Sequence, residues 1–311
     1  MKTLWSKLDA FFFTPASPRP LAALRIGLAA ILIVQAYLLR HDVLNFFAHD
    51  GLVQAGLAEH IADPNTPRIN GVVSWLQGRG LSEAGALLLV ARVYFAALLL
   101  LLVGCWTRPV AAFVWLLHWA LASSGDCSAY GFDMYAHIFL FYLMVVPCGN
   151  AWSLDAARNL GLREPSAFAR VSLRVMQLHL AIAYFASAIE KSTGIQWWNG
   201  ELLWRALTLP EYRQFDMTWL ANYPWITRVS GWGALSIEMF FIILIWPKRT
   251  RRLWVALTAS MHLGIAVLLG LQIFGVIMCV LVISLFGFSA EPEREHLVAA
   301  RAPALSYSPG V

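Results

Sequence analysis

The chain has 311 residues, of which 59% are hydrophobic and 13% are charged, and its mean hydropathy is +0.63. A soluble chain of this length cannot bury so much apolar surface, so the composition indicates an integral membrane protein. The net charge of +5 comes from basic residues dispersed at the ends of apolar stretches, which argues against binding of nucleic acid. The four cysteines form no C-x-x-C pair, which argues against a disulfide framework.

The apolar stretches predict an all-α, polytopic membrane helical bundle with about eight transmembrane helices, at roughly 20 residues per crossing. Residues 1–19 lack the apolar core of a signal peptide, and their Trp5, Leu8 and Phe11–Phe13 are expected to form a short interfacial helix. The predicted spans are 20–39, 85–104, 109–124, 132–147, 170–190, 229–246, 252–270 and 271–289.

Two details of these spans are open to test. The fourth span is short, and we expect it to be buried within the bundle. A single helix over 253–289 would be about 55 Å long, far longer than a bilayer core is thick. We therefore expect a hairpin that turns near Gly270–Gln272.

The distribution of Lys and Arg predicts that both termini are cytoplasmic, and the cluster Lys248–Arg252 contributes most to this bias. The long segments 40–84 and 191–228 then lie on the outer side as interfacial segments. We expect a single membrane domain over 1–290 and a cytoplasmic, disordered tail over 291–311. The second outer segment is rich in tryptophan, as segments at the membrane surface are: it holds Trp197, Trp198, Trp204, Trp219 and Trp225.

Ionisable residues inside the predicted spans cost about 2.5–3.5 kcal/mol each on insertion scales, which makes them candidates for function. They are Arg25, Arg92, His118, Asp133, His137, Arg174, His179, Glu238 and His262. The spacing H-x-x-x-H does not occur, so no metal site is predicted. The sequence also lacks P-loop, dinucleotide-binding and G-x-S-x-G patterns, so the chemistries of soluble enzymes are unsupported.

A polar stripe runs along the fifth span, where Arg170, Gln177, Tyr184 and Lys191 recur every seven residues. These positions drift only about 20° per heptad, so the stripe is expected to face the bundle interior or a cavity. Lys191 lies about 32 Å along the axis from Arg170 and therefore reaches the outer surface. Two interpretations stay open. A desolvated amine there would act as a base, whereas a lysine at a helix end also serves as an interface anchor or pairs with a carboxylate such as that of Glu190.

Asp133 and His137 are four residues apart on the fourth span, so they share a helical face on which the carboxylate is positioned to orient the imidazole. The alternative is that His137 is a hydrogen-bonded core histidine. Glu238 and Arg92 both lie near the predicted midplane, and we expect them to form a structural ion pair, with a catalytic role as the alternative. The histidines expected to be satisfied core residues are His118, His179 and His262.

Taken together, several segments resemble the HTTM (horizontally transferred transmembrane) proteins, bacterial relatives of the membrane domain of the vitamin K-dependent gamma-glutamyl carboxylase. Their order and spacing cover residues 10–289 and imply a protein of the bacterial cytoplasmic membrane. The segments are Phe12–Ala29 (FFTPASPRPLAALRIGLA), Phe46–Leu52 (FFAHDGL), Gly131–Asp155 (GFDMYAHIFLFYLMVVPCGNAWSLD), Tyr184–Gly200 (YFASAIEKSTGIQWWNG), and Glu238 with Met261–Ile265 (MHLGI).

The resemblance implies a quinol-dependent carboxylase. The lysine that matches Lys191 deprotonates a reduced vitamin K-type quinone, here menaquinol, and oxygen then adds to give a strong base. That base removes a gamma-proton from a peptidyl glutamate, carbon dioxide traps the carbanion, and the quinone leaves as an epoxide. A histidine that matches His137 is expected to assist. The residues expected to hold the cofactor are Asp133, Tyr184, Trp197, Trp198, Asn199, Glu238 and His262.

The sequence departs from the animal enzyme in three ways. Glu190 replaces the first of two adjacent lysines, one extra residue precedes the tryptophan segment, and the large lumenal region that binds substrate is not in the sequence. A secreted peptide or protein substrate would then be recognised through 40–84 and 191–228 or through a partner. The alternative is a non-catalytic membrane accessory factor for maturation or export of a secreted peptide, whose pocket binds a membrane lipid, a quinone or a partner helix. A transporter is disfavoured because inverted repeats and paired broken helices are not seen.

Overall fold

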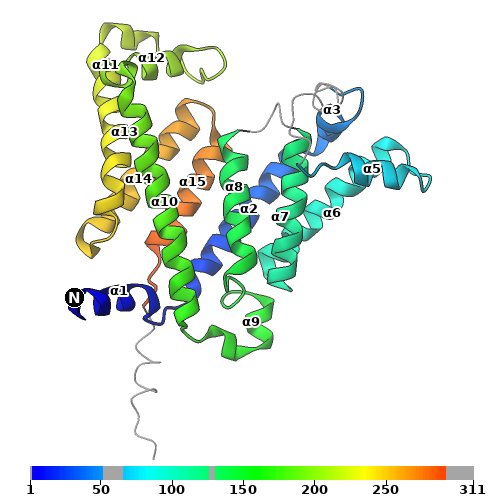
Figure 1. Ribbon diagram of the computed structural model, residues 1–311. Coiled ribbons are helices and arrows are strands. Elements are labelled where there is room, and N and C mark those ends of the chain that lie inside the picture. The colour runs from blue at the N-terminus through cyan, green and yellow to red at the C-terminus, as the bar shows by residue number, and fades with distance from the viewer. Residues whose placement is uncertain (1, 52–65, 126–129, 292–311) are drawn as a thin grey trace, which may run out of the picture.

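The computed structural model describes residues 2–51, 66–125 and 130–291, which fold into helices without any β-strand (Figure 1). Helices occupy all eight ranges predicted as spans. They are α2 (Arg19–Leu38), α6 (Glu83–Val103), α7 (Thr107–Ser124), α8 (Gly131–Val145), α10 (Ala167–Thr193), α13 (Pro224–Leu244), α14 (Lys248–Leu268) and α15 (Gln272–Val282). Four of these, α2, α6, α10 and α13, are long and apolar enough to cross a membrane, and α8 and α15 are shorter apolar helices. The protein is therefore an integral membrane protein.

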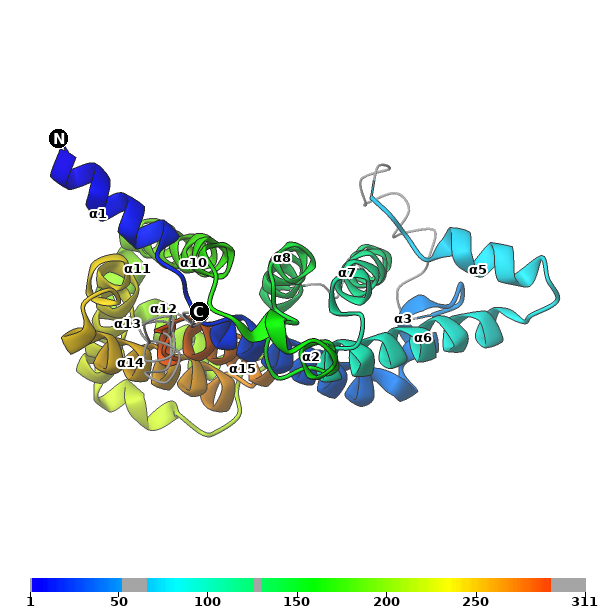
Figure 2. The same cartoon turned by 90° about the horizontal axis from the view of Figure 1, so that it is seen from below.

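The long helices form two groups. Helices α2, α6, α7 and α8 pack together, and so do α10, α13 and α14. Helix α15 joins the groups, because it packs against α14 on one side and against α2 and α8 on the other. Helix α8 lies between α7 and α10 (Figures 1 and 2). One buried apolar core runs through both groups, from α2 and α6 across α8 and α15 to α10 and α13.

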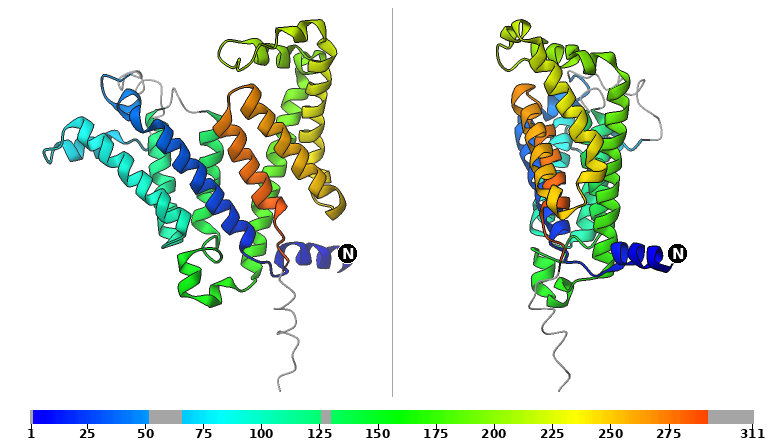
Figure 3. Two further views of the ribbon diagram at one scale, coloured as in Figure 1. Left: turned by 180° about the vertical axis from the view of Figure 1, so that it is seen from behind. Right: turned by 90° about the vertical axis from the view of Figure 1, so that its left-hand side faces the viewer.

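Short helices cluster at the two ends of the bundle (Figure 3). We call the end that carries α1 and α9 the basic end, because α14 starts there with Lys248–Arg252, and we call the opposite end the α11 end. The basic end holds α1 (Lys2–Phe13), α9 (Leu154–Arg158), the 3-10 turn Leu160–Arg163 and the π-helical turn Ile283–Gly287. The α11 end holds α3 (Val43–Phe47), α5 (Asn70–Gln77), α11 (Ile195–Asn199), α12 (Glu201–Thr208) and the 3-10 turns Leu39–His41 and Thr218–Asn222.

The predicted hairpin near Gly270–Gln272 is confirmed. Helix α14 ends at Leu268 and α15 begins at Gln272. Gly270 lies between them with φ of 71°, a left-handed conformation that favours glycine. The short turn keeps α14 and α15 closely packed against each other, so His262 and Phe274 come within reach.

Helix α8 is only partly as predicted. Phe132, Phe139 and Leu143 are fully buried, but Met134 and Phe141 on other faces are 57% and 44% exposed. The expectation that this short span is buried in the bundle is therefore wrong for part of its surface. The reason is that α8 packs mainly on α7 and less on α15 and α2, so other parts of its surface remain exposed.

The predicted N-terminal helix forms as α1 and packs across α10. The Arg174 guanidinium lies 4.1 Å from the centre of the Phe11 ring and donates to the Phe11 carbonyl. Leu4, Trp5 and Leu8 remain largely exposed, as expected of a helix whose apolar side lies in a membrane interface.

Arg25 has a structural role at the basic end. The side chain is fully buried, and its guanidinium donates to the carbonyls of Cys148 (3.1 Å) and Trp152 (2.5 Å), both in the connection after α8. These two carbonyls have no helical partner, because they lie past the end of α8. The buried charge of Arg25 therefore ties this connection to α2.

Asp155 joins the same connection to the start of α7. Its carboxylate accepts the backbone N–H groups of Trp106 (2.9 Å) and Thr107 (2.8 Å) and the Thr107 hydroxyl (2.7 Å). Partial burial alone would raise the pKa of Asp155, but these hydrogen bonds outweigh that effect and hold the pKa below its usual range. The negative charge of the carboxylate is also stabilised by the positive end of the α7 dipole.

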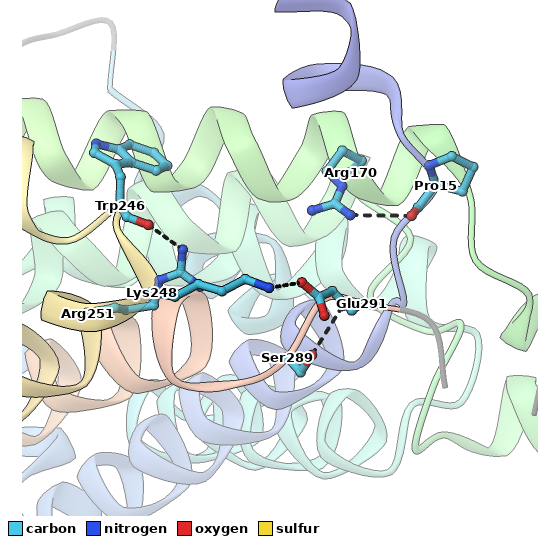
Figure 4. A network of polar contacts seen from close by, with 7 residues as sticks. All are labelled: Pro15, Arg170, Trp246, Lys248, Arg251, Ser289 and Glu291. Carbon is cyan, nitrogen blue, oxygen red and sulfur yellow. Dashed lines mark hydrogen bonds and ion pairs between the residues drawn. The ribbon is translucent and has the colours of Figure 1, made fainter. Parts of the chain in front are cut away.

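A polar network at the basic end involves the first residue of the predicted tail (Figure 4). Lys248 forms an ion pair with Glu291 at 2.6 Å, and Arg251 donates to the Trp246 carbonyl at 2.6 Å. The tail was predicted to be disordered over 291–311. Its remaining residues, 292–311, lie outside the described residues.

Candidate functional site

An ion pair at the α11 end joins the two residues that carry the sequence hypothesis. Lys191, near the end of α10, has its Nζ atom 2.6 Å and 2.7 Å from the two carboxylate oxygens of Glu238 on α13. The Glu238 side chain is 6% exposed, whereas that of Lys191 is 27% exposed. Lys191 therefore pairs with a carboxylate from another helix, and its exposed part faces outwards.

The predicted pair of Glu238 with Arg92 does not form. Glu238 is bound to Lys191, while Arg92 is exposed on α6 in the other helix group. The prediction placed both residues at a similar depth, which is not enough, because α6 and α13 belong to different packing groups.

A second polar contact lies deeper on the same stripe. The Tyr184 hydroxyl and the His262 Nε2 atom are 2.8 Å apart, and both side chains are buried. Tyr184 is one heptad below Lys191, about 10 Å along α10. Its ring also packs on Phe241 of α13, with 4.5 Å between ring centres. His262 lies within electrostatic range of Lys191, and Tyr184 within range of Glu238. The structure thus brings together Lys191, Glu238, Tyr184 and His262 from three helices.

One nitrogen of this group has no partner. The His262 Nδ1 atom is buried and makes no hydrogen bond with any residue that the structure describes. The His262 ring is 5.9 Å from that of Phe274, which in turn is 6.4 Å from the Tyr135 ring of α8. Tyr135 is also within electrostatic range of Glu238. His262 Nδ1 is therefore a buried, unsatisfied ring nitrogen with aromatic neighbours, which calls for an explanation.

The tryptophan segment covers the ion pair from α11. The Lys191 Nζ atom lies 5.2 Å from the centre of the Trp197 ring, a cation–π arrangement. Trp198 instead has a structural contact, because its Nε1 atom donates to the Ser192 carbonyl at 2.8 Å. The Asn199 side chain accepts the backbone N–H of Glu201 at 2.9 Å at the start of α12. Of the three predicted residues, Trp197 alone contacts Lys191.

His137 lies in a different environment. Its ring stacks on Trp115 at 5.2 Å and lies 5.4 Å from Trp119, both on α7. Its buried Nδ1 atom has no hydrogen-bond partner among the described residues. Tyr135, two positions earlier, instead lies beside Phe274 of α15, on the face of α8 towards Lys191. Residues two apart on a helix point in nearly opposite directions, so α8 separates His137 from Lys191.

Asp133 does not orient His137. Its carboxylate accepts the backbone N–H of Tyr130 at 3.1 Å, as the acidic residue of a capping box at the start of α8. His118 is the histidine beside it, with its Nε2 atom 3.5 Å from the Asp133 carbonyl and its Nδ1 atom 3.1 Å from the Tyr94 hydroxyl. His118 is thus a satisfied core histidine, as predicted.

Sequence reasoning missed Tyr135 and Phe274. Tyr135 lies within the segment Gly131–Asp155 that carries the family resemblance, and its position opposite His137 on α8 was a usable signal. Phe274 had no such signal, since it is one apolar residue among many on α15. In the part of the chain that the structure describes, no three His, Cys, Asp or Glu side chains gather as metal ligands would.

Comparison with known proteins identifies the family. The model of the HTTM domain matches residues 13–289, nearly the whole helical bundle. The chain belongs to the HTTM family. It is also similar to the uncharacterized protein YitO of Bacillus subtilis (strain 168), with 26% identity over 199 residues, which are 60% of this chain and 62% of that protein. No solved structure matches the chain.

Proposed function

We propose that this HTTM protein is a quinol-dependent gamma-glutamyl carboxylase-like enzyme of the bacterial cytoplasmic membrane. The observation that carries the proposal is the pairing of Lys191, 27% exposed at the α11 end, with the buried carboxylate of Glu238. An amine in that position is accessible to a ligand on one side and has a built-in proton partner on the other.

The residues present fit an aromatic cofactor with hydroxyl groups. The Trp197 indole offers a flat apolar surface beside Lys191, and the buried His262 Nδ1 atom is open to a hydrogen bond. A reduced vitamin K-type quinone such as menaquinol, with oxygen and carbon dioxide as co-substrates, would supply the strong base needed to remove a gamma-proton from a peptidyl glutamate. Lys191, Trp197 and His262 are the residues that would hold it.

The chain's own part in the reaction is proton handling and positioning. Lys191 Nζ donates to both Glu238 oxygens at 2.6 and 2.7 Å, the distances of strong hydrogen bonds. Transfer of one of these protons to Glu238 leaves a neutral amine, which is then able to take a proton at Nζ. Tyr184 orients the His262 ring through its hydroxyl. Phe241 packs on the Tyr184 ring and Phe274 lies beside the His262 ring, so this hydrogen bond below the ion pair has apolar neighbours. His137 is a second candidate catalytic residue, and it lies on the other face of α8.

Incorporation of labelled carbon dioxide tests this proposal. Purified protein is supplied with menaquinol, oxygen, labelled bicarbonate and a glutamyl peptide. We expect incorporation that K191A lowers by about 10²–10⁴-fold, the usual contribution of a general base. Lys248 is the matched control, because it also pairs with a glutamate at 2.6 Å but at the basic end, so K248A keeps full activity. H137Q tests the second candidate. Absence of both incorporation and quinone epoxide, or full activity of K191A, overturns the proposal.

The same ion pair also favours the second function, a non-catalytic accessory factor for maturation or export of a secreted peptide. Both charged groups are satisfied by each other, as in a structural pair. A K191M/E238L variant replaces the pair by apolar side chains of similar size. If that variant supports secretion of the peptide at the wild-type level in cells, the accessory role is favoured over catalysis.

We further propose that all eight long helices cross the membrane, with both termini and the basic end in the cytoplasm. The positions of Lys248–Arg252 and Arg158 at the basic end support this orientation. Single cysteines at Ser192 and Arg249 provide the test in a cysteine-free background. A reagent that does not cross the membrane should label the first in intact cells and the second only after lysis, and the reverse pattern inverts the topology.

A further inference from the structure

A cavity lies within the group of α2, α6, α7 and α8. It has a volume of about 790 Å³, and Ile273 of α15 also lines it. Its walls are mainly apolar side chains, and Lys191, Glu238, Tyr184 and His262 do not line it. A cavity of this size is within the range of small-ligand sites, and it is distinct from the proposed carboxylase site.

Arg92 is the exceptional residue of this cavity. It lies near the middle of α6, about 14 Å along the axis from Glu83, in the most apolar of the four long spans. Its side chain is exposed and lines the cavity. It makes no hydrogen bond, ion pair or ring contact within the described ranges 2–51, 66–125 and 130–291. Charged residues at such a depth require a partner, and the described part of the chain supplies none for Arg92.

The charges around the cavity favour an anion. Arg40, at the end of α2, also lines it, and its guanidinium is held 3.9 Å from the centre of the Tyr37 ring. The carboxylate in the lining is that of Asp133, which already accepts the Tyr130 N–H. Among the described lining residues, two arginines stand against one engaged carboxylate, so this part of the lining is positively charged.

The apolar walls favour a long hydrocarbon chain. Along α6 the lining extends from Leu87 to Leu99, about 18 Å. Phe46 and Phe47 of α3 contribute aromatic surface at the α11 end. Tyr94 and His118 also line the cavity, but they hydrogen-bond to each other and therefore need no partner from a ligand.

We propose that this cavity binds an amphiphile with an anionic head group and a long hydrocarbon chain, and that Arg92 holds the anion. The head group then lies at the depth of Arg92, in the middle of α6, and not at the membrane surface where the head groups of surrounding lipids lie. A fatty acid and an anionic phospholipid share this chemistry, and the experiment separates them.

Native mass spectrometry of the full-length protein in detergent provides the test. Delipidated protein is titrated with palmitate, with phosphatidylglycerol, and with monopalmitin as an uncharged analogue that has the same chain as palmitate. We expect at least one anionic probe to bind tenfold or more tightly than monopalmitin, and the identity of that probe tells fatty acid from phospholipid. Equal binding of the charged and uncharged probes, or no binding of either anion, overturns the proposal.

Three variants and a matched control locate the site. R92Q is expected to abolish the preference for the anion, while R92K keeps most of it. Arg79 is the matched control, since it lies outside the cavity lining with its guanidinium 3.6 Å from the Trp75 ring centre, so R79Q binds as the wild type does. Ala96→Trp fills the cavity without a change of charge and is expected to weaken both charged and uncharged probes. Wild-type binding by both R92Q and Ala96→Trp places the ligand elsewhere and overturns the assignment.

Discussion

The Lys191–Glu238 pair predicts that its two partners are unequal in their effect on stability. Lys191→Met leaves the Glu238 carboxylate, 6% exposed, without its counter-ion in the bundle interior. Glu238→Leu leaves the Lys191 ammonium, which is 27% exposed and still lies over the Trp197 ring. The lysine can reach water and the carboxylate cannot, so the loss of Lys191 is expected to cost more.

The magnitudes follow from burial. Removing one partner of a fully buried pair costs about 3–5 kcal/mol. We expect the low end of that range, about 3 kcal/mol, for Lys191→Met, and about 1 kcal/mol for Glu238→Leu, as for a pair that is partly exposed. Replacing both residues leaves no unpaired charge, so the double variant is expected within about 1 kcal/mol of the wild type. The coupling energy between the two sites is then about 3 kcal/mol.

Denaturant titration in mixed micelles, with helical circular dichroism as the signal, measures these free energies of unfolding. The matched control is the pair of Lys248 and Glu291, which has the same 2.6 Å distance but side chains 77% and 65% exposed, and whose coupling should be below about 1 kcal/mol. Equal costs of the two single variants, or strict additivity in the double variant, would refute the reasoning from burial.

Two further predictions concern single hydrogen-bonded groups. Because hydrogen bonds lower the folded pKa of Asp155 below its ordinary 3.8, its stabilising effect is full above pH 3.8 and is lost as the pH falls through the folded value. The difference in free energy of unfolding between wild type and Asp155→Asn should therefore shrink on acidification, and a pH-independent difference contradicts this. Tyr184→Phe removes the hydrogen bond of the buried His262 and should cost about 1–3 kcal/mol. Tyr142→Phe, which breaks a 2.8 Å bond to a half-buried histidine, is the control, and thermal unfolding should show the smaller loss there.

Much of the bundle could be predicted from local properties. The apolar stretches predicted helices in the correct ranges, because each stretch must satisfy its own backbone hydrogen bonds in hydrocarbon. The seven-residue spacing of Tyr184 and Lys191 correctly indicated a shared face, since helical periodicity depends only on the backbone of α10. The length of the apolar stretch 253–289, about 55 Å as one helix, indicated the hairpin for an equally local reason.

The partners of the polar side chains were predicted less well. Asp133 and His137 do share a face, but Asp133 is in the first turn of α8, where unpaired backbone N–H groups compete for its carboxylate. Glu238 was expected to bind Arg92 at a similar depth, and it binds Lys191 instead. Depth along the membrane is a property of the sequence, whereas the direction in which a side chain points depends on how each helix is rotated against its neighbours.

The sequence by itself determined the membrane class, the ranges of the helices and the position of Lys191 at the end of a polar stripe. These properties follow from hydropathy and helical period, which each segment has independently of the others. The tertiary structure alone decided that Glu238 is the partner of Lys191, that α8 separates His137 from it, and that Arg92 lines a separate cavity. Each of these depends on the packing of helices far apart in the chain, which selects one partner among several ionisable groups of similar depth.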